Sequence, residues 1–72
     1  MPSLPSFKPR EIEKILLENG FYVKRQVGSH RTYYNSKTNK IAIIPFHSKD
    51  IPKGTVRSII KQSGIEEKVF RK

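Results

Sequence analysis

Apolar residues recur with helical spacing in the first third of the chain, at Ile12, Ile15 and Leu16. This i, i+3, i+4 pattern predicts an amphipathic helix with one apolar face. Pro9 suits the first helical position, because its missing N–H needs no partner there. Gly20 is typical of the residue that follows a helix in the left-handed conformation, and Phe21 can then fold back on the last turn. We therefore expect a helix that begins at Pro9 and ends just before Gly20.

A second helical pattern lies near the carboxyl end of the chain, at Val56, Ile59 and Ile60. Gly64 marks its end for the same conformational reason. The sequence is compatible with two starts: Asp50 caps the helix with Pro52 in the first turn, or Thr55 caps a shorter helix. Residues 66–72 leave room for at most one more turn.

Between the two helices the pattern changes to strands, in residues 21–27, 30–35 and 41–45. In the first of them alternation places three apolar side chains on one face, those of Phe21, Val23 and Val27. Arg25 is the one exception on that face. The second strand is rich in β-forming side chains, and Pro45 ends the third because it cannot donate to a ladder. The short connections predict antiparallel pairing.

These elements predict an α+β fold with the order α-β-β-β-α. A three-stranded antiparallel sheet must cover at least one face, so we expect both helices on the face of Phe21 and Val23 and the other face open. The second strand is compatible with either orientation, since Thr32 and Tyr34 share one side and Tyr33 takes the other.

Length and composition exclude several classes of protein. A chain of 72 residues buries only about 60% of the surface that its unfolded form exposes, so we expect one small domain over residues 1–72. The chain has no cysteine, which excludes disulfides, thiol catalysis and the usual zinc sites with Cys ligands. No segment reaches the roughly 18 apolar residues of a membrane helix, and residues 1–10 lack the apolar core of a signal peptide. We therefore expect a soluble protein that spans no membrane, and the lack of cysteine is compatible with the cytoplasmic location that we expect.

The charge of the chain is strongly positive, with 15 Lys and Arg against 6 Asp and Glu. A formal net charge of +9 indicates a polyanionic partner, because such a field attracts phosphates and releases counterions on binding. Nucleic acid is the first candidate. An anionic membrane surface or an acidic protein would satisfy the same charge.

Part of this charge follows one side of the second predicted helix, at Lys53, Arg57 and Lys61. The i, i+4, i+8 spacing places these side chains in one stripe, away from the apolar residues of the helix. The plainest interpretation is a solvated helix face. Because no acidic residue is interleaved, we favour a phosphate-binding stripe, which is how double-stranded RNA-binding domains use basic side chains on a helix.

Residues 28–31 (GSHR) combine four features suited to RNA chemistry. Gly28 allows a close backbone approach to a phosphate, and Ser29 offers an N–H and a hydroxyl. The imidazole of His30 can move protons near neutral pH, and RNA supplies its own nucleophile in the ribose 2′-hydroxyl. Arg31 or a lysine would neutralise the charge that develops on phosphorus. The three-residue motif is weak by itself, and a structural or surface role for His30 stays open at this point.

Longer segments of the sequence resemble the HicA family of toxin-type mRNA interferases: "ILLENGF" (15–21), "GSHRTYY" (28–34) and "IPFHSKDIPKGTVRSIIKQSGI" (44–65). The resemblance leaves out residues 1–7. It implies a fold like that of a double-stranded RNA-binding domain, ribosome-independent cleavage of mRNA without a cofactor, and a HicB-type antitoxin as the partner. The catalytic histidine of the family falls on His30.

The resemblance does not decide the roles of several other residues. His47 is either a second acid or base or a loop residue that contacts the second helix or the antitoxin. Tyr33 and Tyr34 either stack on unpaired bases or pack within the sheet. A metal site is not expected, since Asp50 and the glutamates have only two histidines to combine with. The main alternative function is a non-catalytic RNA-binding module of the same fold. A DNA-binding accessory protein fits the charge but lacks a recognition helix with base-reading side chains.

Overall fold

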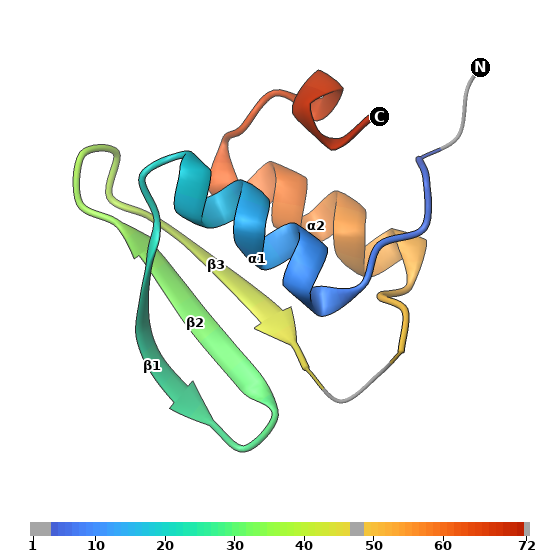
Figure 1. Ribbon diagram of the computed structural model, residues 1–72. Coiled ribbons are helices and arrows are strands. Elements are labelled where there is room, and N and C mark those ends of the chain that lie inside the picture. The colour runs from blue at the N-terminus through green and yellow to red at the C-terminus, as the bar shows by residue number, and fades with distance from the viewer. Residues whose placement is uncertain (1–3, 47–48, 72) are drawn as a thin grey trace.

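The computed structural model describes residues 4–46 and 49–71 of the chain, and Figure 1 shows their arrangement. The elements, in chain order, are α1 (Pro9–Glu18), β1 (Tyr22–Val27), β2 (His30–Asn35), β3 (Lys40–Pro45), α2 (Lys53–Ser63) and a 3-10 turn, η1 (Glu67–Phe70). The strands form one antiparallel sheet in the order β1-β2-β3. The expected α+β fold with the order α-β-β-β-α is confirmed.

Helix α1 begins and ends as its sequence predicts. Pro9 is its first residue, and the backbone N–H of Lys8 donates to the Glu11 carboxylate over 2.8 Å. At the other end Gly20 has a φ of +89°, and the N–H of Phe21 donates to the carbonyl of Leu16 over 3.0 Å. This hydrogen bond is the one found in a Schellman motif, in which a left-handed glycine follows the helix, and it turns Phe21 back toward the core.

The two helices lie on one face of the sheet (Figure 1). Tyr33 is fully buried on that face, and strand alternation puts Arg31 on the same side. His30, Thr32 and Tyr34 therefore point to the open face. The orientation of β2, which its sequence leaves undecided, follows from the burial of Tyr33 beneath the helices.

The expected pattern of β1 is wrong in its second half. The pairing with β2 is irregular between Val23 and Arg25, so Val23 lies opposite Tyr33 whereas Val27 lies opposite His30. One extra residue in a strand reverses the alternation beyond it. Val23 and Val27 consequently lie on opposite faces, and neither is in the core, with exposures of 43% and 66%.

The start of helix α2 differs from both expected starts, since neither Asp50 nor Thr55 caps it. Lys53 is its first residue and Pro52 occupies the capping position, with no side chain bonded to the helix end. The helix ends at Ser63, and Gly64 follows it in the left-handed conformation expected, with a φ of +71°. The side chain of Gln62 accepts the backbone N–H of Ile43 over 3.4 Å, so the helix lies along the outer edge of β3.

Residues before α1 and in η1 complete the core. Leu4, Phe7 and Phe70 are buried, and the rings of Phe7 and Phe70 meet edge to face with centroids 6.2 Å apart. Phe7 also forms an isolated backbone bridge with Ile51. The described part of the segment before α1 is thus packed in the fold, although the resemblance begins after Phe7.

Within the described ranges, 4–46 and 49–71, no helix has the length and apolar character needed to cross a membrane.

Candidate functional site

His30 is the first residue of β2, and its side chain is exposed on the open face of the sheet. Its register partners are Val27 on β1 and Pro45 at the end of β3. The histidine therefore sits at the rim of the sheet, beside the turn between β1 and β2.

The turn before His30 is held at both of its residues. The side-chain amide of Gln26 donates to the carbonyl of Gly28 over 3.1 Å, and the N–H of Phe46 donates to the carbonyl of Ser29 over 2.6 Å. Gly28 has a φ of +59°, and a Cβ built there would meet no atom within 4 Å. The two hydrogen bonds thus fix the turn, while the space beside Gly28 is open. This arrangement allows the backbone to approach a phosphate closely.

Arg31 lies on the other face of the sheet from His30. Its guanidinium donates to the Glu13 carboxylate over 2.9 Å and to the side-chain oxygen of Gln26 over 3.0 Å. It also stacks on the ring of Phe46, 4.1 Å from the ring centroid. The cation that the sequence places next to the histidine is therefore held by α1 and by the end of β3.

The Glu13 carboxylate has a second partner, the hydroxyl of Tyr33, which donates to the same oxygen. Burial raises the pKa of Tyr33 far above its ordinary value, and the hydrogen bond to Glu13 adds to the effect because it favours the neutral hydroxyl. Glu13 was not expected in the site. Its partners lie 18 and 20 residues further along the chain, and no local sequence pattern predicts such a contact.

The two tyrosines of β2 have different surroundings. Tyr33 is fully buried, so its place is in the packing of the sheet and not on a base. Tyr34 is half-buried on the open face, where its ring meets that of Tyr22 with centroids 5.8 Å apart and Lys24 lies over it.

The basic stripe is present on α2, with Lys53, Arg57 and Lys61 all exposed. It belongs to the helix layer (Figure 1). The register and the burial of Tyr33 place the side chain of His30 on the opposite face of the sheet. The structure thus places the consecutive residues 28–30 on one side of the sheet and the stripe on the other.

Among the residues of ranges 4–46 and 49–71, no three His, Asp or Glu side chains form a group that could hold a metal ion. His47 lies outside the described residues.

A comparison with protein families matches residues 9–65 to a family described as the HicA toxin of bacterial toxin-antitoxin. The matched segment runs from the first residue of α1 to just beyond α2 and includes the turn with His30. No curated protein matches the chain.

Proposed function

The chain belongs to the HicA toxin family, and we propose that this toxin is an endoribonuclease that cleaves mRNA with His30 as its catalytic base. In this proposal the reaction needs neither a ribosome nor a metal ion and takes place in the cytoplasm. The observation that carries the proposal is the exposed imidazole of His30 directly after a turn that is hydrogen-bonded at both Gly28 and Ser29.

His30 would accept the proton of a ribose 2′-hydroxyl, whose oxygen then attacks the neighbouring phosphorus. The bond from phosphorus to the 5′ oxygen breaks, and that oxygen takes up a proton. One product ends in a 2′,3′-cyclic phosphate and the other in a 5′-hydroxyl. The backbone at Gly28 and Ser29 would face the phosphate that reacts. His47 remains the candidate for the second acid or base.

RNA would be held mainly by charge. Lys53, Arg57 and Lys61 are exposed and free to meet phosphates along α2. Arg31 already shares its charge with Glu13, so its part would be to support the turn and to add a weaker positive field. The separation of the stripe from His30 requires RNA long enough to reach both sides of the sheet.

The partner would be a HicB-type antitoxin on the open face of the sheet. Four exposed apolar side chains share that face with His30: Tyr22, Val27, Ile41 and Ile43. A partner that covers them would also cover the histidine, and the net charge of +9 would attract an acidic surface. Masking of His30 would then silence the toxin.

The His30→Ala variant tests the catalytic role. Because the side chain is exposed, its removal should leave thermal melting and RNA retardation close to those of the wild type and should abolish cleavage of a single-stranded RNA. The wild type should cut in EDTA and leave 5′-hydroxyl ends, whereas a metal-activated water usually leaves 5′-phosphates. Cleavage by His30→Ala would transfer the role to His47. Binding without any cleavage by the wild type would identify an RNA-binding module instead.

A further inference from the structure

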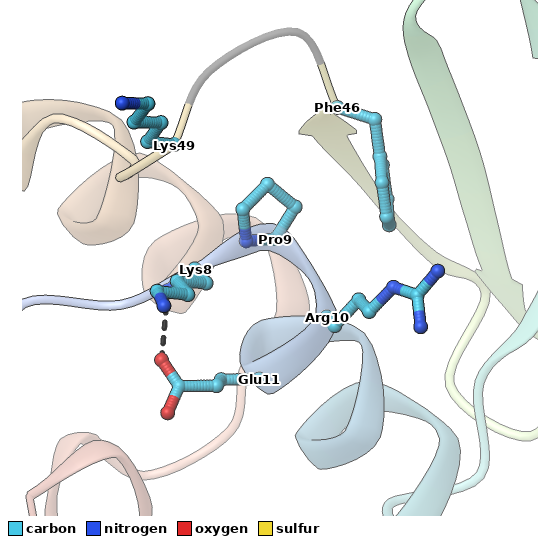
Figure 2. A pocket seen from close by; sticks show the side chains of 6 residues that line it. All are labelled: Lys8, Pro9, Arg10, Glu11, Phe46 and Lys49. Atoms are coloured by element: carbon cyan, nitrogen blue, oxygen red, sulfur yellow. Dashed lines mark hydrogen bonds between the residues drawn. The ribbon is translucent and has the colours of Figure 1, made fainter.

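A pocket lies between the start of α1 and the end of β3, at the same end of the sheet as His30. It has a volume of about 440 Å³ and is lined by Lys8, Pro9, Arg10, Glu11, Phe46 and Lys49. Figure 2 shows Phe46 and Arg10 on one side of Pro9 and Lys49 on the other. The volume falls within the range of about 300–1,000 Å³ that is typical of sites for small ligands.

The lining of this pocket is positively charged. Three of its side chains are cations, Lys8, Arg10 and Lys49, and only Glu11 is acidic. The Glu11 carboxylate accepts the N–H of Lys8 at the start of α1, so it is already engaged with the backbone. Within the described ranges none of the three cations forms an ion pair with a carboxylate. The pocket thus offers positive charge that the fold itself does not neutralise.

Phe46 connects the pocket to the candidate site. Its ring is half-buried and borders the pocket, while Arg31 covers part of it from the sheet. Its backbone N–H holds the carbonyl of Ser29 over 2.6 Å, one residue before His30. A ligand against this ring would therefore lie next to the turn that carries the histidine.

We propose that this pocket is a nucleotide subsite for single-stranded RNA, in which a base packs against Phe46 and phosphates meet Lys8, Arg10 and Lys49. Stacking on aromatic rings beside a positively charged groove is how proteins hold unpaired strands without reading their sequence. The inference rests on the proposed function, which makes RNA the substrate. It adds that the strand crosses the rim of the sheet, from His30 on one face to this pocket on the other. An acidic segment of a protein would use the cations but has no need of the ring.

A short RNA that cannot be cleaved tests the pocket separately from catalysis. The probe is a 2′-O-methyl hexanucleotide of mixed sequence, which lacks the attacking hydroxyl, and its affinity for the full chain is measured by fluorescence anisotropy at low salt. Arg10→Glu should weaken binding at least tenfold. Phe46→Leu, which keeps an apolar side chain without a ring, should weaken it at least fivefold, as expected for the loss of a stacked base.

Lys37→Glu is the matched control, because it makes the same charge change on an exposed residue beyond the opposite end of β2. It should weaken binding less than threefold. Arg10→Glu should fold well, since Arg10 is exposed and an acidic residue in the first helical turn is favourable. If Phe46→Leu does not fold, the comparison of Arg10→Glu with Lys37→Glu decides alone.

Equal losses in Arg10→Glu and Lys37→Glu would overturn the subsite, because net charge alone would then explain both. Loss of antitoxin binding with unchanged RNA affinity in Arg10→Glu would also overturn it, and would assign the pocket to the protein partner. The proposed function fails in a different way. If the wild type binds the probe through the pocket but does not cut unmodified RNA, the subsite stands and the endoribonuclease does not.

Discussion

His30 and Arg31 are neighbours in the chain, yet their side chains lie on opposite faces of the sheet. Arg31 is bound to Glu13 of α1, while His30 is exposed on the open face. A histidine and a cation that are adjacent in the sequence thus have different surroundings: the imidazole is exposed, where the proposed substrate would reach it, whereas the guanidinium ties its strand to α1.

The Glu13 carboxylate accepts hydrogen bonds from both Arg31 and Tyr33, and its removal should destabilise the fold. Glu13→Ala would leave the buried hydroxyl of Tyr33 without its acceptor, at a cost of about 1–3 kcal/mol in the free energy of unfolding. Glu18→Ala removes an exposed carboxylate from the same helix and should change stability by less than about 0.5 kcal/mol. Urea denaturation measures both. A cost for Glu13→Ala no larger than that of the control would mean that the contact adds nothing.

The raised pKa of Tyr33 predicts a loss of stability at high pH. In the unfolded chain a tyrosine ionises near pH 10, whereas folded Tyr33 stays protonated well above that value. The folded state therefore holds more protons above about pH 10, and the free energy of unfolding falls as pH rises through this range. The contribution of Tyr33 to stability should be fully present below the pKa that this tyrosine has in the unfolded chain. Tyr33→Phe should have a flatter decline between pH 9 and pH 11 in urea titrations, with the lysines contributing equally to both proteins. Parallel declines would contradict the shift.

The stripe on α2 predicts a strong dependence of RNA binding on salt. If about four phosphates are held, the slope of log affinity against log salt should be near −3, and affinity should fall roughly 50-fold between 50 and 200 mM. Lys53→Ala and Arg57→Ala should each weaken binding for all sequences and make the slope shallower by about 0.7. Lys68→Ala, on η1, is the control, and its slope should match the wild type. A flat response of the wild type would leave the stripe as a solvated helix face.

Most of the fold was predictable because its signals are local. The cap at Gly20, the helical spacing of Ile12 and Leu16, and the β-forming run of β2 each act within a few residues, and each is confirmed. The face pattern of β1 was only partly predictable. Arg25 stands out as the exception to the alternation, but the irregular pairing between Val23 and Arg25 depends on the partner strand, so the sequence of β1 alone does not show that the later residues change faces.

In the candidate site, too, the local features could be predicted and the long-range contacts could not. His30 at the start of a strand could be predicted, since the preceding glycine and serine mark a turn. The contact of Glu13 with Arg31 could not, because it depends on how α1 crosses the sheet. The pocket beside Phe46 likewise forms only when the start of α1 meets the end of β3, and Lys8, Arg10 and Lys49 belong to no single motif.

The open face of the sheet gives a test of the proposed antitoxin contact that spares catalysis. Ile41 is 46% exposed on that face and lies four residues along β3 from Pro45, the register partner of His30. At about 3.3 Å per residue the two ends are roughly 13 Å apart, so Ile41→Asp should leave cleavage by the free toxin unchanged. Burial of an aspartate in an apolar contact should weaken antitoxin binding by about 30-fold or more, the loss expected at the centre of an interface.

Val69 is the matched control for this change, since it is 41% exposed but lies on η1, away from the open face. Cleavage of single-stranded RNA is measured with increasing amounts of antitoxin. Wild type and Val69→Asp should be inhibited alike, whereas Ile41→Asp should stay active at antitoxin concentrations that silence both. Full inhibition of Ile41→Asp, or escape of Val69→Asp, would move the antitoxin to another surface. Masking of His30 by a partner on the open face would then be the wrong explanation of how the toxin is controlled.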